Sequence, residues 1–439
     1  MMLLFKNVEV EGQVIDVRVA QTTVAEVGPE LSVVPGEDVI DGGGGALLPG
    51  LHDHHAHLLA MAAADRSVQL AGATDVATSL RAADRRLPPG AWLRAVGWGG
   101  SGGDLDRETL NAVVPHRPVR VQHRSGALWV LNSAALQRIG LDDPTGRLFG
   151  SDALLRSRID VAEPLDLPAV GRRLASYGVT GITDATAFSD MSGPELLAGG
   201  GLSQRLVLMG APDLAVDSGP GGVVWGPAKV MLADHTLPPL NDVIEQFQIA
   251  RSRHRSVAVH SVTAASLVLA LTAWDEVGTR SGDRIEHGAV IPADLIARIA
   301  DIGLTVVTQP NFVVEREDQY RAEIDADELD SLYRCRTLLD AGIPVAFGTD
   351  APFGDADPWR AVDGAVERAL GPAERLDPIR ALACFLSSPI QPGGGPRRVR
   401  PGERADLCLL HEPLAGALRE PSAELVAVTV WNGTAVHND

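Results

Sequence analysis

The middle of the chain, from about residue 49 to residue 390, alternates short apolar segments with segments of helical period. We interpret the apolar segments as strands and the others as helices. The expected strands include Val179–Asp184, Arg205–Met209, Ala228–Leu232, Ser256–His260, Arg284–His287, Leu304–Thr308 and Pro344–Gly348, and the expected helices include Asn241–Arg253, Ala264–Val277, Pro292–Asp301 and Ser331–Ala341. Strand–helix repetition indicates a parallel sheet. A stretch of about 340 residues suits a (β/α)₈ TIM-type barrel with insertions better than a smaller open sheet.

The two ends of the chain share a pattern that differs from the middle. Residues 1–48 and 391–439 contain short β-rich segments, separated by turn residues such as Asp41–Gly45 and Asn432-Gly433. We therefore predict an α/β protein in which a small β-sandwich domain, built from both termini, accompanies a barrel domain over residues 49–390.

Residues 58–170 interrupt the strand–helix rhythm of the barrel. This stretch is rich in Arg, Gly and Pro, and it carries strand-like segments at Trp92–Gly97 and Val119–His123. We interpret it as a large insertion after the first barrel strand that shapes the substrate pocket.

Composition excludes several classes of protein. A net charge of -19 repels phosphate backbones, so we expect no nucleic-acid partner. The three cysteines show no C-x-x-C spacing, which argues against a disulfide framework or a cysteine zinc site. The N-terminus lacks the basic region of a signal peptide, and no apolar run reaches about 18 residues. We expect a cytoplasmic protein without membrane contact; a homo-oligomer stays open.

The strongest local signal is the segment Leu47–His57, which ends in an H-x-H motif. Because alternate residues of a strand point the same way, Asp53, His55 and His57 should share one face, and His52 and His54 the other. Two imidazoles at a strand end can bind one metal ion. The alternative is a chance cluster, since four of the twelve histidines fall within six residues.

Four further residues of ligand type lie on later predicted strands. His260 and His287 end two strands, Asp350 follows a third, and Lys229 lies within a fourth. Barrels bind ligands at the C-terminal ends of their strands. Taken singly, the histidines are equally well explained as structural side chains, Asp350 as a helix N-cap and Lys229 as a solvated charge. Four such coincidences in strand order after an H-x-H are much less expected.

The order H-x-H, Lys, His, His, Asp resembles the binuclear amidohydrolase superfamily. The resemblance extends to Pro49-Gly50, to R-I-E-H at Arg284–His287, to G-T-D-A-P at Gly348–Pro352 and to G-E-R-A-D-L at Gly402–Leu407. The long insertion, with Gly97-Trp98 and Asn132–Leu136, looks like the amidohydrolase family 3 branch, which includes N-substituted formamide deformylases.

The resemblance implies two divalent metal ions, with zinc expected first and manganese, iron or nickel as alternatives. His55 and His57 would bind the first ion, and His260 and His287 the second. Lys229, carboxylated by carbon dioxide, would bridge both ions. Asp350 would ligate the first ion and, as the catalytic residue, transfer the proton. The implied activity is hydrolysis of a non-peptide carbon–nitrogen bond (an amide, N-acyl, formamide or cyclic amide) of a small molecule by a metal-bridging hydroxide. Such an enzyme acts on carbon–nitrogen bonds other than peptide bonds.

The chain departs from the branch where substrate would be contacted. Members often carry Gly-His where this chain has Gly126-Ala127, and either His123 replaces that histidine or it is unrelated. Candidate substrate-binding residues, each also explicable as an ordinary loop or core residue, are Trp98, His123, Arg124, Gln309 and Asn311, with Trp129 and Trp225 as further pocket or core candidates. Asp184 could support a ligand histidine from outside the ligand set, or cap the backbone.

Two other functions remain in view. One is a deaminase of a ring amine on the same barrel, against which Lys229 argues, because deaminases of this superfamily usually lack the bridging lysine. The other is a non-catalytic scaffold, against which the complete set of six ligands argues.

Overall fold

The computed structural model describes residues 2–99, 103–159, 165–216 and 220–439. Its larger compact unit comprises Met1–Leu58 and Leu167–Asp439, and its smaller one Leu59–Asp166. The predicted domain boundaries at residues 48, 58, 170 and 390 stay predictions.

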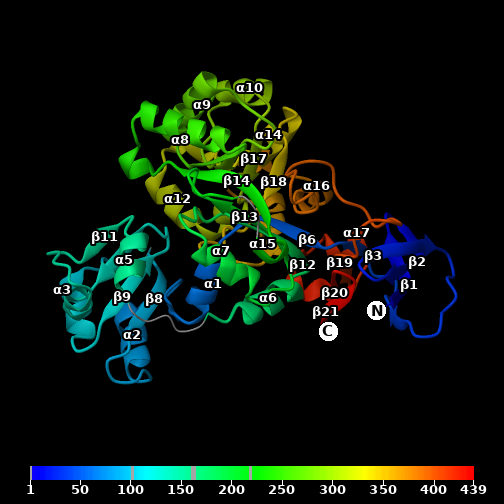
Figure 1. Cartoon of the computed structure of the whole chain (residues 1–439), viewed down its shortest axis with the longest axis horizontal. Helices are drawn as coiled ribbons and strands as arrows, with labels where there is room; N and C mark the ends of the chain where they lie inside the picture. Colours follow the sequence, from blue (N-terminus) through cyan, green and yellow to red (C-terminus); the bar gives the residue numbers. More distant parts are fainter. Residues whose placement is uncertain (1, 100–102, 160–164, 217–219) are drawn as a thin grey trace. The chain divides into compact units, whose positions relative to one another are not determined.

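Eight parallel strands form a nearly closed barrel in the larger unit (Figure 1). In sheet order they are β18 (Val345–Phe347), β17 (Thr305–Thr308), β16 (Arg284–His287), β15 (Val257–Ser261), β14 (Val224–Met231), β13 (Arg205–Gly210), β12 (Val179–Asp184) and β6 (Leu51–Ala56). Strands β6, β12 and β16 are buried at every residue, as expected for parallel strands covered on both faces. The predicted TIM-type α/β fold is confirmed.

Helices follow most of the barrel strands and cover the sheet (Figure 1). They are α6 (Leu167–Ser176), α7 (Ser192–Ala198), α8 (Leu240–Ser252), α9 (Ala264–Val277), α10 (Ala293–Asp301), α14 (Cys335–Asp340), α15 (Pro358–Val366) and α16 (Pro378–Ala383), with short helices α11 (Asn311–Glu315), α12 (Glu317–Glu323) and α13 (Ala326–Leu329) after β17. The side chains of Thr263 and Ser266 form a capping box that begins α9 directly after β15. Within the described residues, no helix has the length and apolarity needed to cross a membrane.

The seam between the last and the first barrel strands is held by a side chain as well as by backbone. The Asp53 carboxylate of β6 accepts hydrogen bonds from the backbone nitrogen of Thr349 at 3.1 Å and from its hydroxyl at 2.6 Å. The Asp350 nitrogen donates to the His55 carbonyl at 2.7 Å. A Cβ on Gly348 would lie 2.5 Å from the His55 nitrogen, so only glycine permits this close approach.

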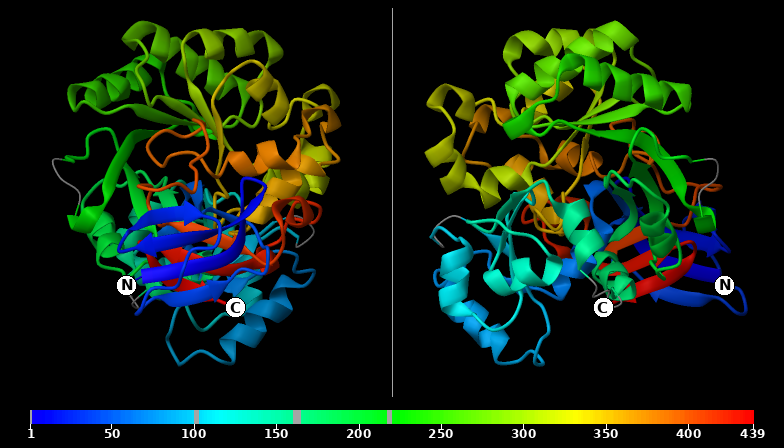
Figure 2. Two further views of the ribbon diagram at one scale, coloured as in Figure 1. Left: turned by 90° about the vertical axis from the view of Figure 1, so that its right-hand side faces the viewer. Right: turned by 60° about the vertical axis from the view of Figure 1, so that its left-hand side comes forward.

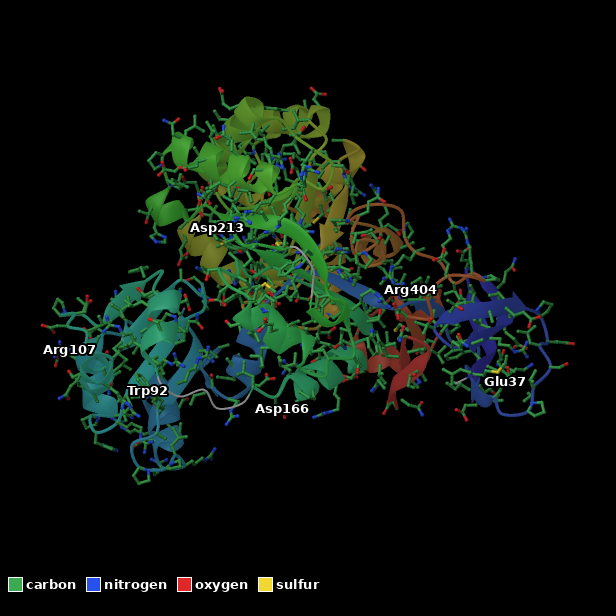
Figure 3. The ribbon with its side chains drawn as sticks, in the orientation of Figure 1. Glu37, Trp92, Arg107, Asp166, Asp213 and Arg404 are labelled. Atoms are coloured by element: carbon green, nitrogen blue, oxygen red, sulfur yellow. The ribbon has the colours of Figure 1, made fainter. Side chains whose placement is uncertain are left out.

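The chain termini build two small sheets that share one core. One sheet has the order β3 (Thr23–Gly28), β2 (Gln13–Ala20), β1 (Met2–Val10), β4 (Asp38–Asp41), and the other β21 (Thr434–Asn438), β20 (Val426–Trp431), β19 (Leu407–Leu410), β5 (Leu47–Pro49). Blue and red strands lie side by side in both views of Figure 2, and buried residues of both sheets, including Phe5, Val17 and Val430, form one cluster. Arg404, labelled in Figure 3, pairs with Thr23 through backbone between the two segments. The predicted β domain from both termini is confirmed.

The smaller unit contains its own five-stranded sheet. Its order is β11 (Arg147–Phe149), β10 (Leu128–Leu131), β9 (Val119–His123), β8 (Leu93–Trp98), β7 (Val68–Gln69), accompanied by α2 (Val76–Asp84), α3 (Arg107–Val113), α4 (Ser133–Ile139) and α5 (Asp152–Arg158). The unit begins within α1 (Leu58–Asp65), directly after the first barrel strand, where an insertion was predicted. Asn132 lies between β10 and α4, and its side-chain oxygen caps the helix and also accepts from the Val119 nitrogen at the start of β9.

Candidate metal centre

The histidines of β6 divide between its two faces as the strand period predicts. The His55 and His57 rings lie 5.4 Å apart, and their ligand atoms and one from Asp350 all lie within 4.8 Å of one another. His52 and His54 point away from this group: the His52 ring pairs with the Thr183 hydroxyl at 2.9 Å. The His54 ring pairs with Ser387 at 3.0 Å. Within the described residues, the group of side chains that could hold a metal ion includes the histidines of the first face.

Asp350, in the loop after β18, brings a carboxylate to His55 and His57 across the barrel seam. Its Oδ1 lies 3.3 Å from His57 Nε2 and 3.6 Å from His55 Nε2, and it has no hydrogen-bond partner among the residues that the structure describes. Ligand atoms at about 2.0–2.1 Å from one tetrahedral ion lie about 3.3–3.4 Å apart. Asp350 adopts a φ of +56°, a conformation that costs a non-glycine residue free energy and that clusters at functional sites. The three side chains thus have the spacing of ligands around a common ion.

His260 and His287 form the second part of the cluster. Their rings lie 4.4 Å apart, and the His287 ring lies 4.7 Å from that of His55. His287 has a φ of +70° at the end of β16, which is a second strained residue in the same place. The predicted strand-end histidines therefore come together from β6, β15 and β16.

Lys229 lies on β14, next to the strand that carries His260. It is buried, and its Nζ has no hydrogen-bond partner within the described residues. Burial lowers the pKa of Lys229 to about 8, although the Glu286 and Asp350 carboxylates act to raise it. Lys6 and Lys229 are the only lysines of the chain, and Lys6 is ion-paired to Asp16. A buried amine without a partner is costly, which fits a residue that is modified or binds a group in the working protein.

Burial favours the neutral form of three histidines of the cluster, His55, His260 and His287. Burial lowers the pKa of the His55 and His287 imidazoles well below the usual value, with neighbouring positive groups acting in the same direction. Burial also lowers the pKa of His260 to about 3. Neutral imidazole is the form that ligates metal ions. Together with the unpaired Lys229 Nζ and Asp350 Oδ1, this donor set fits a metal centre.

The Nδ1 nitrogens of three proposed ligand histidines each contact a polar side chain. His55 Nδ1 contacts the carboxylate of Glu286, His287 Nδ1 lies 2.9 Å from Gln309 Oε1, and His57 Nδ1 lies 3.0 Å from Thr186 Oγ1. Such contacts fix the tautomer and ring orientation of a metal ligand. Sequence reasoning missed Glu286 and Thr186. The signal for Glu286 was present in the R-I-E-H motif, since strand alternation puts Arg284 and Glu286 on one face.

Asp184 acts on the backbone beside His57. Its Oδ2 accepts from the Leu58 nitrogen at 2.8 Å and its Oδ1 from the Thr186 nitrogen at 3.0 Å. Asp184 therefore caps the backbone, which was one of the two predicted roles. The capped segments lie next to His57 and include its partner Thr186, so this capping also agrees with the other predicted role, support of a ligand histidine.

The predicted substrate residues fall in two places. Gln309 and Asn311 lie in the larger unit, where Gln309 contacts His287 and Asn311 Nδ2 donates to the Thr349 carbonyl at 3.2 Å. Gln309 Nε2 and Asn311 Oδ1 are buried without a partner. Trp98, His123 and Arg124 lie in the smaller unit.

Within the smaller unit, the Trp98 and His123 rings are 5.2 Å apart. The Arg124 backbone nitrogen donates to the Trp98 carbonyl at 2.7 Å. Trp129 is packed in a buried cluster with Leu136 and donates to Asp152. Burial in a core cluster favours the core interpretation of Trp129 and equally of Trp98, while the substrate roles of Trp98, His123 and Arg124 stay predictions.

Comparisons with known proteins support the resemblance seen in the sequence. Two curated relatives are each 25% identical: the putative amidohydrolase YtcJ of Bacillus subtilis over 76% of this chain and 75% of its own length, and the N-substituted formamide deformylase of Arthrobacter pascens over 90% of both. Among solved structures, an uncharacterized metal-dependent hydrolase of Pyrococcus horikoshii has the same fold, with a TM-score of 0.74 at 19% identity over 100% of both chains. A family model, Amidohydro_3, described as "Amidohydrolase family", matches residues 38–437. The chain therefore belongs to amidohydrolase family 3.

Proposed function

We propose that this chain is a metal-dependent hydrolase that cleaves a non-peptide carbon–nitrogen bond of amide type. The observation that carries the proposal is the convergence of His55, His57 and Asp350 within 4.8 Å of one another, with His260, His287 and the unpaired Lys229 beside them. The 25% identity to an N-substituted formamide deformylase adds support for the bond type.

Lys229 is suited to carry the bridging carboxylate. Burial lowers the pKa of Lys229 to about 8, so its neutral amine is reached more easily than that of an exposed lysine. A neutral Nζ can form a bond to the carbon of carbon dioxide and release one proton to solvent, which gives an anionic carbamate. An ammonium cannot ligate a cation, whereas the carbamate oxygens can, so the modification converts a costly buried cation into a ligand.

Two divalent ions, when bound, would supply Lewis acidity and lower the pKa of water to about 7. His55, His57 and Asp350 would hold the first ion, His260 and His287 the second, and Lys229 both. Zinc suits this set of nitrogen and oxygen donors.

Asp350 is the residue placed to move the proton. Its Oδ1 faces the histidine pair at ligand spacing, which would leave the second carboxylate oxygen to accept a proton from the attacking water and deliver it to the leaving nitrogen. Phe353 borders the same place, because its ring lies 5.5 Å from that of His57. An apolar wall there favours substrates with an apolar group beside the scissile bond.

The alternative functions receive less support. A one-metal deaminase has no use for a buried lysine beside the ligands, and Lys229 occupies that place. A non-catalytic scaffold would not need the strained conformations of His287 and Asp350.

The test is turnover of a panel of small molecules by the zinc-loaded full chain. The panel comprises N-formyl amines, N-acyl amino compounds, cyclic amides and aminated heterocycles, with Asp350→Asn as the control. We expect amine or ring-opened product from at least one amide class and none from the control. Ammonia release from the heterocycles alone would establish the deaminase, and inactivity on every class by protein that binds two ions would contradict the proposal.

A further inference from the structure

Glu286 lies inside the barrel between a proposed metal ligand and a buried arginine. It is fully buried, one of its carboxylate oxygens contacts His55 Nδ1, and the other accepts from Arg284 Nε. Arg284 is also buried, and it donates to the His54 carbonyl at 3.4 Å. The negative charge of Glu286 is thus balanced by Arg284 of the same strand, and its second carboxylate oxygen contacts His55.

The strand period explains how β16 reaches a ligand on another strand. Arg284 and Glu286 are two residues apart, so both project from the same face. Strand β16 is separated from β6 by β17 and β18 around the barrel, so the contact between Glu286 and His55 crosses the lumen. His287, next in the chain, joins the cluster through its left-handed backbone conformation.

The contact assigns the two nitrogens of His55 to different tasks. Nδ1 donates its proton to Glu286, which leaves the lone pair of Nε2 directed to the place where Asp350 Oδ1 lies, 3.6 Å away. A carboxylate partner both fixes the ring and raises the basicity of the ligating nitrogen.

His287 has a weaker version of the same support. Its hydrogen-bond partner at Nδ1 is the neutral amide of Gln309, at 2.9 Å, and the nearest carboxylate oxygen, from Asp350, lies farther away at 3.9 Å, whereas His55 Nδ1 contacts a carboxylate directly. A neutral acceptor orients the ring but raises its basicity less than a carboxylate does. One histidine of the first position, His55, is therefore supported by a carboxylate, whereas His287 of the second position is supported by a neutral amide.

We propose that Glu286 is a positioning residue for His55, and that it makes the position formed by His55, His57 and Asp350 the tighter of the two metal positions. This inference rests on the proposed binuclear function. Loss of an outer partner of a metal ligand typically weakens metal binding by about 10- to 100-fold, and that is the effect we expect from removing the charge of Glu286.

The experiment counts the metal ions that the zinc-loaded full chain retains after dialysis against graded concentrations of a chelator. The wild type should lose its two ions in two separate steps. Glu286→Gln keeps an oxygen acceptor but removes the charge. In this variant the more tightly bound ion, which the wild type loses second, should bind about 10- to 100-fold more weakly, so that the two steps of metal loss come closer together. Glu286→Asp should restore part of the separation. In the matched variant Gln309→Glu, the earlier step should move toward tighter binding.

Folding is followed by thermal unfolding, because breaking a buried ion pair is destabilising. If Glu286→Gln does not fold, the double variant Arg284→Met/Glu286→Gln removes both charges and keeps the comparison. Two unshifted steps in a folded Glu286 variant, or one joint step in the wild type, would overturn this inference and leave the proposed function standing. A wild type that binds no zinc would instead overturn the proposed function.

Discussion

The two halves of the metal centre are built in different ways. His55, His57 and Asp350 come from β6 and from the loop after β18, which meet at the barrel seam although they are almost 300 residues apart in sequence. Lys229, His260 and His287 come from β14, β15 and β16, three neighbouring strands joined by continuous backbone pairing. The first half therefore depends on closure of the seam, while the second is held by the sheet itself.

The largest effect on kcat is expected for substitution of Asp350, which follows the last barrel strand at the seam. Asp350→Asn removes the proton acceptor and one anionic ligand, so kcat should fall by about 10²- to 10⁴-fold. Steady-state kinetics on the best substrate of the panel measures this, with zinc counted in the same sample. A kcat within threefold of the wild type would show that Asp350 does not transfer the proton.

In the proposed centre Lys229 would bridge the two halves, so its loss should affect both. Lys229→Ala should lower kcat by more than about 10²-fold, which exceeds the usual effect of an outer partner, and added bicarbonate should not restore it. Kinetics with and without bicarbonate are the measurement, and Lys6→Arg is the control for a lysine away from the site. Full turnover with two ions retained by Lys229→Ala would exclude the bridging role.

Asp53 tests the dependence of the first half on the seam. Asp53→Ala leaves the His55 and Thr349 nitrogens without their acceptor in a buried place. The free energy of unfolding should fall by about 2–4 kcal/mol, and the first metal position should weaken while the second is kept. Denaturant unfolding and zinc counting report the two effects. Equal weakening of both positions would mean that the seam is not specific to the first half.

Thr349→Val sharpens the same comparison with a smaller change. It removes the hydroxyl that donates to Asp53 at 2.6 Å but leaves the two backbone donors to that carboxylate in place. We expect a loss of about 1 kcal/mol in the free energy of unfolding, measured by denaturant titration. A loss as large as that in Asp53→Ala would mean that the Thr349 hydroxyl alone accounts for the contribution of Asp53 to the stability of the seam.

Sequence reasoning predicts the elements whose pattern is local. Strands Val179–Asp184 and Arg284–His287 and helix Ala264–Val277 have the predicted bounds, because burial and capping are visible in their own residues. The helix predicted at Ser331–Ala341 begins at Cys335 instead. The Arg368 guanidinium holds the Leu332 and Tyr333 carbonyls in a turn before it, and this distant partner leaves no local signal.

The candidate site divides along the same line. The strand-end rule points to His55, His57, His260, His287 and Asp350, and the resemblance to the family supplies the role of Lys229, which lies within its strand. The partners Glu286 and Thr186 act on histidines of other strands, and Gln309, predicted to bind substrate, contacts His287. Such contacts depend on the closed barrel, which a single strand pattern does not contain.

A carboxylated Lys229 that bridges the two halves would be detected by ¹³C NMR of the zinc-loaded enzyme in ¹³C-labelled bicarbonate. The chain has two lysines, so the spectrum is simple to assign. We predict one carbamate carbon per chain, retained in Lys6→Arg and absent in Lys229→Arg. An active, zinc-loaded wild type without a carbamate signal would contradict the account.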